Sequence, residues 1–151
     1  MTPPMRFSVS ADEDTGVARA VIELLERRGH RVVAVHGALS ADEQTEWARC
    51  SAAAARDVAE GRADQGVVCC WTGTGASIAA NKVAGIRAAL CGDGPTASGA
   101  RRWNDANVLA LSLRATSEAV LEEILDAWLK GMPSPDADDR ASVAHLAELE
   151  R

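Results

Sequence analysis

The sequence predicts an α/β fold in which helices cover both faces of one parallel sheet. Short apolar or β-branched segments alternate along the chain with longer segments of helical periodicity, and this alternation is typical of βαβ units. The length of 151 residues and the hydrophobic content of 47% suit one domain. A chain of this size buries roughly two-thirds of its unfolded surface, so it needs no metal or disulfide for stability.

Five segments are expected to be strands because they are short and either apolar or alternating. They are residues 6–11, 31–35, 65–70, 86–91 and 107–112. Parallel sheets of this kind bind ligands at the carboxyl ends of their strands. We therefore look for a site in residues 11–16, 70–75, 92–95 and 112–114.

Helical spacing of apolar residues predicts helices over residues 15–28, 43–60, 75–82 and 117–130, and Pro95 is expected to open another. Gly29 and Gly61 are expected to end the first two helices, because glycine adopts left-handed backbone angles easily. Ser117 is expected to cap the helix that follows it, since its hydroxyl can accept a bond from a free first-turn amide.

The C-terminal segment is expected to be separate from this domain. Residues 131–139 read as a linker, and residues 140–149 as a last helix with apolar residues on one face. A helix this short is marginal alone, so a partner subunit is a candidate to cover it. We therefore divide the chain into a domain at residues 1–131 and a linker with a C-terminal helix at residues 132–151.

Composition excludes several classes of function. The net charge of −6 and the few aromatic residues argue against a nucleic-acid-binding surface. No apolar run approaches the roughly 20 residues that span a membrane, and the N-terminus has no apolar signal core, so we expect a cytoplasmic protein. No Cys-x-x-Cys pair or histidine cluster suggests a metal site.

The loop at residues 70–75, Cys-Trp-Thr-Gly-Thr-Gly, is the strongest candidate for a site. Its glycines let the backbone approach a ligand, and the helix that follows presents free amides and a partial positive charge. The loop lacks the Gly-Lys-Ser/Thr of a Walker motif. It also lacks the third glycine of a dinucleotide fingerprint and follows the third strand instead of the first.

The two adjacent cysteines are expected to face opposite sides of their strand. Cys69 is interpreted as a small core residue. Cys70 stands just before the loop amides, where a thiol can act as a base or nucleophile. The alternative is that Cys70 also only fills the core.

Three stretches carry a resemblance to a known family. They are GTGASIAANK at residues 73–82, GIRAALC at residues 85–91 and NDANVLAL at residues 104–111. They resemble the ribose-5-phosphate isomerase B family, which includes the galactose-6-phosphate isomerase subunits, and the match runs over residues 6–129. The resemblance implies a three-layer, Rossmann-like domain with a five-stranded parallel sheet. It also implies a homodimer, or a tetramer, with sites shared between subunits and with no metal or nucleotide cofactor.

The resemblance further implies an aldose–ketose isomerase that acts on a phosphorylated sugar such as ribose 5-phosphate through a cis-enediolate. Cys70 matches the family's base, and Thr72 matches the hydroxyl that assists it. Asp12 and Asn104 match substrate-binding residues. The full expected substrate-binding set is Asp12, Glu13, Trp71, Gly73, Thr74, Gly75, Ala76, Ser77, Trp103, Asn104 and Arg140.

Several of these positions depart from the family pattern. Glu13 replaces a histidine after the first strand, and is either a substitute acid or base or a solvated helix-start residue. Trp103 replaces the histidine that opens the sugar ring, and Trp71 replaces a glycine. Trp47 either stacks on a ligand or fills space. Arg140 is the nearest candidate for the arginines that hold phosphate in the family.

These departures leave two alternatives to a ribose 5-phosphate-like substrate. One is the same chemistry on an acyclic or non-phosphorylated substrate, because ring opening needs a proton shuttle near neutral pH and histidine suits that role. The other is a non-catalytic homologue that binds a sugar phosphate.

Overall fold

The computed structural model describes residues 3–41 and 44–150. Within these ranges, five strands form one parallel sheet in the order β2-β1-β3-β5-β4. The strands are β1 (Arg6–Ala11), β2 (Arg31–Gly37), β3 (Gln65–Cys70), β4 (Ala88–Leu90) and β5 (Val108–Ser112). The helices are α1 (Ala18–Arg27), α2 (Trp47–Ala59), α3 (Thr74–Asn81), α4 (Gly94–Asn104), α5 (Glu118–Lys130) and α6 (Ala137–Glu148).

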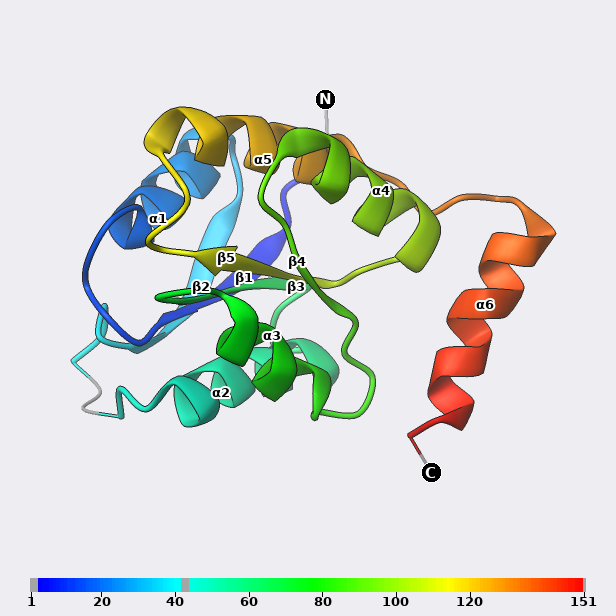
Figure 1. The fold of residues 1–151 in the computed structure, drawn as a ribbon, viewed down its shortest axis with the longest axis horizontal. Coiled ribbons are helices and arrows are strands. Elements are labelled where there is room, and N and C mark those ends of the chain that lie inside the picture. Colours follow the sequence, from blue (N-terminus) through cyan, green and yellow to red (C-terminus); the bar gives the residue numbers. More distant parts are fainter. Residues whose placement is uncertain (1–2, 42–43, 151) are drawn as a thin grey trace.

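The domain has three layers, which confirms the predicted α/β class. Helices α1, α4 and α5 cover one face of the sheet, and α2 and α3 cover the other (Figure 1). The first face is built from large side chains such as Phe7, Leu125 and Trp128. The second is built mostly from alanine and valine, so α2 and α3 can lie close to the strands that end at the candidate loop.

The predicted ranges for β1 and β3 are confirmed residue for residue. The first helix begins at Ala18 instead of residue 15, because Gly16 adopts a left-handed backbone with φ +55°. The expected start of the second helix at residue 43 lies outside the described residues, and that helix begins at Trp47. Strand β4 is shorter than expected at its start because side-chain oxygens of Asn107 and Asn81 bind the amides of residues 87 and 88.

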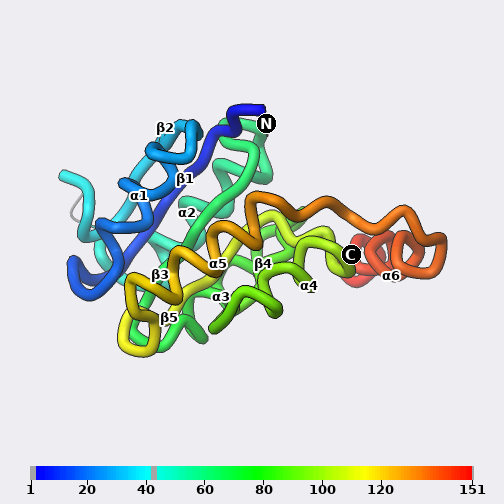
Figure 2. Tube along the Cα trace, turned by 90° about the horizontal axis from the view of Figure 1, so that it is seen from above, coloured from blue at the N-terminus to red at the C-terminus, as the bar shows by residue number. Residues whose placement is uncertain are grey.

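The C-terminal helix begins earlier than predicted, at Ala137, so the expected linker is shorter. Asp136 caps it by accepting a hydrogen bond from the Asp138 amide, and acidic residues in the first turn favour the positive helix end. Figures 1 and 2 show α6 standing beside the domain, where it meets α4. No residue of α6 is buried, and a Glu150 carboxylate oxygen accepts the Gly85 N–H at 3.0 Å.

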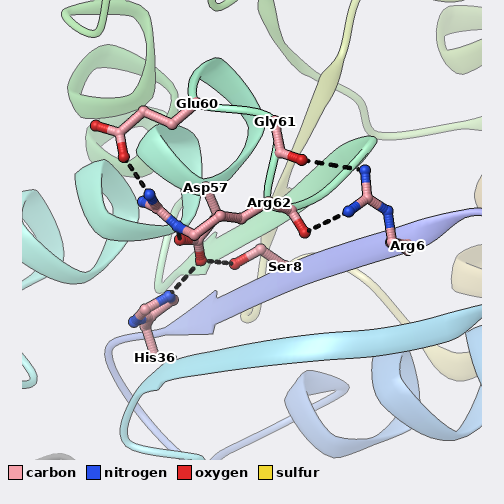
Figure 3. Close-up of polar contacts among 7 residues, drawn as sticks. All are labelled: Arg6, Ser8, His36, Asp57, Glu60, Gly61 and Arg62. Carbon is pink, nitrogen blue, oxygen red and sulfur yellow. Dashed lines mark hydrogen bonds and ion pairs between the residues drawn. The ribbon is translucent and has the colours of Figure 1, made fainter.

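A buried carboxylate joins α2 to the first two strands. Asp57 of α2 accepts hydrogen bonds from Ser8 Oγ at 2.8 Å and Arg62 Nε at 2.9 Å. Its Oδ2 also lies 2.7 Å from Nε2 of His36 on β2. Figure 3 shows these side chains meeting between the helix and the sheet. The cluster fixes α2, whose first residue, Trp47, lies at the candidate site.

The strand order creates a switch point between β1 and β3. The chain leaves β1 toward β2 on one side and returns to β3 on the other. Crossovers that diverge in this way leave a crevice at the carboxyl ends of the two strands. Asp12 follows β1 and Cys70 ends β3, so both stand at that crevice. No helix in the described part of the chain is long and apolar enough to cross a membrane.

Candidate active site

A pocket of about 280 Å³ opens at this switch point. It is built from the end of β1, the end of β3 with its loop, and the first residue of α2. Its lining residues are Asp12, Trp47, Cys70, Trp71, Thr72, Thr74 and Gly75. All except Trp47 belong to the substrate and catalytic residues expected from the sequence.

The Cys70 sulfur lies at the start of α3 and is almost fully buried, with 5% of the residue exposed. Its Sγ accepts hydrogen bonds from the Gly73 amide at 3.1 Å and the Ala76 amide at 3.4 Å. Gly73 turns its amide inward through a left-handed backbone with φ +78°. Two backbone N–H groups and the N-terminus of α3, both of which attract negative charge, therefore meet at this sulfur.

The neighbouring thiol is in a different environment. Cys69 is fully buried in the core on the α1 and α5 side of the sheet, as its interpretation as a core residue predicts. Burial, followed by the nearby Cys70 and Asp12, raises the pKa of Cys69 far above the ordinary thiol value. Burial also raises the pKa values of Cys50 and Cys91 to about 11. Of the four thiols, Cys70 is the one that lines the pocket.

The loop hydroxyls and amides fall into two groups. Thr72 Oγ1 and Thr74 Oγ1 lie 2.8 Å apart and are exposed at the pocket. The Gly73 and Ala76 amides are directed to the sulfur, and the Ser77 amide donates to the Gly73 carbonyl at 3.1 Å. The first-turn amides of Thr74 and Gly75 have no partner within their own helix. An anion in the pocket would therefore meet these two amides and the threonine hydroxyls.

Asp12 supplies the pocket with a carboxyl group whose pKa is raised and one of whose oxygens is unpaired. Burial, and then the nearby carboxylate of Glu13, raise the pKa of Asp12 above its ordinary value. Its Oδ1 is buried and has no hydrogen-bond partner among the described residues. Glu13 itself is exposed. Asp12 is therefore suited to hold a proton closer to neutral pH than an ordinary aspartate.

Two indole rings form part of the pocket wall. Trp47 lies against Gly75, where an added Cβ would come within 2.8 Å of the ring. Trp47 and Trp71 are 45% and 49% exposed, so both rings present a face to the solvent and to a ligand. Trp47 thus lines the pocket, and its stacking on a ligand stays a prediction.

Three expected site residues lie elsewhere in the chain. Helix α4 runs from the carboxyl edge of β4 back to the amino end of β5 (Figure 1). Trp103 and Asn104 end that helix, so they stand at the opposite edge of the sheet from Cys70. Trp103 and Arg140 line a separate pocket of about 470 Å³ between α4 and α6. One copy of the chain does not bring these residues to the sulfur.

Arg114 lies in the range 112–114 where the sequence predicts a site, but it was not among the named substrate-binding residues. It lines a hollow of about 290 Å³ that meets the Cys70 pocket at Thr72. Its amide donates to the Trp71 carbonyl at 3.0 Å, and its exposed guanidinium forms no ion pair with a described residue. Its position two residues after β5 was the available signal. Among residues 3–41 and 44–150, no group of three histidine, cysteine or acidic side chains is arranged to hold a metal.

Comparison with known proteins decides the family. The model of the family described as Ribose/Galactose Isomerase matches residues 8–146. The chain belongs to this family. Membership in the Ribose/Galactose Isomerase family makes it, as a class, an aldose–ketose isomerase of sugar phosphates, as the resemblance in the sequence implied.

Relatives within the Ribose/Galactose Isomerase family support this over nearly the whole chain. A ribose-5-phosphate isomerase B of Mycobacterium leprae is 36% identical over 149 residues, covering 97% of this chain and 91% of the relative. A D-erythrulose-4-phosphate isomerase 2 of Mycolicibacterium smegmatis is 33% identical over 109 residues, 72% of each chain. The type B ribose 5-phosphate isomerase of Trypanosoma brucei superposes with a TM-score of 0.88 at 34% identity, covering 97% of this chain and 99% of that one.

Proposed function

We propose that this isomerase interconverts an aldose phosphate and its ketose phosphate, with the Cys70 thiolate as the base. The observation that carries the proposal is the position of Cys70 Sγ, held by two amides at the edge of a pocket that also contains Asp12 and Thr72. The thiolate takes the proton from C2 of the open-chain aldose, and the C–H electrons form the C1–C2 double bond of a cis-enediolate. Return of a proton to C1 then gives the ketose.

The negative charge of the intermediate develops on the oxygen of C1. We infer that the first-turn amides of Thr74 and Gly75, with the hydroxyls of Thr72 and Thr74, stabilise this oxygen. Fixed donors in a partly enclosed site are effective for a charge that develops during reaction. Asp12, with its raised pKa, is suited to pass a proton between the two substrate oxygens.

The phosphate and the remaining residues call for a second copy of the chain. Arg114 is our candidate for the phosphate, because its guanidinium forms no ion pair with a described residue and its hollow adjoins the Cys70 pocket at Thr72. We infer that the protein is a homodimer in which the partner copy brings its own Trp103, Asn104 and Arg140 to this pocket. Helix α6, which buries no residue in its own chain, is then covered by the partner.

The placement of the histidines favours an open-chain substrate over ribose 5-phosphate. His30 Nδ1 accepts the Met5 amide, His36 pairs with Asp57, and His145 lies on α6. None of these imidazoles lines the Cys70 pocket of its own copy, so one copy of the chain offers no histidine there to open a furanose ring. A four-carbon sugar 4-phosphate needs no ring opening, since its terminal oxygen carries the phosphate. One relative is named as an isomerase of such a compound.

The experiment compares substrates and variants in one assay. Wild type, Cys70→Ala and the control Cys69→Ala are incubated with ribose 5-phosphate, erythrulose 4-phosphate or free ribose, and product is followed by NMR. We expect turnover in wild type and in Cys69→Ala, a loss of about 10²- to 10⁴-fold in Cys70→Ala, and a preference for the four-carbon phosphate. Equal rates in the two alanine variants would contradict the role of Cys70. A preference for ribose 5-phosphate would contradict only the open-chain substrate.

A further inference from the structure

One face of β1 carries a row of polar side chains toward α2. Alternate residues of a strand point to the same face, and Phe7, Val9 and Ala11 pack into the core on the opposite side. The intervening residues Ser8 and Ser10 therefore face α2, as the Ser8–Asp57 hydrogen bond confirms for the first of them (Figure 3). Asp12, two residues after Ser10, continues this row into the pocket.

Three oxygens at the pocket end of this row have no hydrogen-bond partner among the described residues. They are Ser10 Oγ, Asp12 Oδ1 and, from α2, Ser51 Oγ. Ser10 and Ser51 are fully buried, whereas the equally buried Ser8 is satisfied by Asp57. A buried hydroxyl without a partner is unfavourable, so each of these oxygens requires a partner other than the described side chains and amides.

Ser51 lies one helical turn from the pocket residue Trp47. It follows Trp47 by four residues in α2, so the two side chains share one face of the helix. Trp47 lines the pocket, and Ser51, one turn further along, is fully buried. A Cβ added at Gly37 would overlap the Ala11 carbonyl oxygen and lie 3.2 Å from Cys50 Cβ, which places the residue before Ser51 beside the end of β1.

The spacing within β1 suits a bridging molecule of small size. Alternate residues of a strand are about 6.6 Å apart, too far for a serine and an aspartate to bond directly along the strand. Two oxygens bridged by one water lie at most about 5.5 Å apart, twice an ordinary O–H···O distance, and side chains that lean toward each other reach this separation from alternate residues. A buried water typically makes about three hydrogen bonds, which matches the three unpaired oxygens.

We propose that Ser10, Ser51 and Asp12 bind one internal water molecule beneath the floor of the Cys70 pocket, and that this water controls the protonation of Asp12. The water site does not depend on the proposed activity, whereas its effect on turnover does. Ser10 and Ser51 are then positioning residues, because they act on the substrate through the water and the carboxyl group. The titratable group that acts on this carboxyl is Glu13 on its own loop, and Asp12 in turn raises the pKa values of the Cys50 and Cys69 thiols.

Two measurements on the full-length protein test the water site without relying on turnover. A high-resolution crystal structure of the wild type should contain a water hydrogen-bonded to at least two of the three oxygens. Carboxyl ¹³C NMR, with Asp12 assigned by Asp12→Asn, gives the pKa of Asp12 in wild type, Ser10→Ala and Ser51→Ala. Ser8→Ala is the matched control. It removes a hydroxyl from the same face of the same strand, but that hydroxyl is bonded to Asp57 and does not belong to the proposed water site.

Loss of the water's partners leaves the Asp12 carboxylate less well solvated. We expect the pKa of Asp12 to rise by about 0.5 unit or more in Ser10→Ala and Ser51→Ala, since one unit corresponds to about 1.4 kcal/mol. In the double variant the two shifts should not add, because both act through one water. Ser8→Ala should leave the Asp12 pKa unchanged. A wild-type crystal structure with no such water overturns the site, and a bound water with an unchanged pKa in both variants overturns its control of Asp12.

Discussion

Substitution of Gly73 by alanine tests whether the loop geometry around Cys70 is as tightly fixed as the structure indicates. Gly73 has a φ of +78°, and an added Cβ would lie 2.5 Å from Leu90 Cδ1. It would also lie 2.8 Å from the Leu111 carbonyl carbon and 2.9 Å from the Ser112 amide nitrogen. The last two atoms belong to the backbone of β5, which pairs with β3. They cannot move aside as the end of a flexible side chain can.

The expected loss of stability has two parts. A left-handed conformation is unfavourable for an L-residue by about 1–2 kcal/mol, and overpacking against backbone adds about 1–3 kcal/mol. We therefore expect Gly73→Ala to lower the free energy of unfolding by about 2–5 kcal/mol. Gly29→Ala is the control, because Gly29 has a φ of +86° and no atom within 4 Å of an added Cβ. Gly29→Ala should lose only the contribution of the left-handed conformation, about 1–2 kcal/mol of unfolding free energy.

Urea titrations followed by circular dichroism would give both free energies of unfolding under one set of conditions. The difference between the variants should be about 1–3 kcal/mol, the size of the overpacking contribution alone. Gly73→Ala should also lose activity, since the shift moves the amide that donates to Cys70 Sγ. Equal losses of stability in the two variants would refute the close approach of the loop to β5.

Three further predictions concern the rest of the site and its support. Burial favours a raised pKa for Asp57, but hydrogen bonds, that of His36 foremost, outweigh it and lower this pKa. Asp57→Asn should therefore lose about 1–3 kcal/mol at pH 7, and its unfolding free energy should approach that of the wild type as the pH falls below about 3.9. Trp47→Ala should raise KM several-fold with little loss of stability, because the half-exposed ring covers Gly75 in the pocket; an unchanged KM would leave it a space-filling residue. Arg114→Met should raise KM for a sugar phosphate by about 10-fold or more, because it removes a charged hydrogen bond. The KM for phosphate-free sugars should not change. Equal effects on both kinds of substrate would exclude a phosphate contact.

Much of the fold follows from local patterns in the sequence. The strands β1 and β3 are predicted to the residue because β1 alternates polar and apolar residues, β3 is a short apolar run, and each is followed by a loop. The ends of α1 and α6 are predicted less well. The starts of these helices depend on the left-handed backbone of Gly16 and on the cap formed by Asp136. Neither feature alters the spacing of apolar residues from which the helices are predicted.

The sequence predicts where the candidate site lies in the fold, but not how its side chains and amides are oriented. The position of Cys70 at a strand end and the glycines after it predict a loop at the carboxyl edge of the sheet. The sequence does not indicate that two of the loop amides turn to the sulfur, because that depends on how α3 packs. The distance of Trp103 from Cys70 does follow from parallel topology, since a helix between two parallel strands must end at the amino edge. The resemblance assigned this residue to a site shared between subunits, which is compatible with its place at the amino edge if a partner copy supplies it.

The most direct test of the account is whether Cys70 moves the substrate proton. The measurement is the rate at which deuterium from D₂O enters C2 of the recovered aldose phosphate, or C1 of the ketose product, in wild type and Cys70→Ser. We predict rapid incorporation in the wild type and a decrease of about 10²- to 10⁴-fold in the variant, with its fold and free energy of unfolding close to those of the wild type. Undiminished incorporation in a correctly folded Cys70→Ser protein would contradict the account.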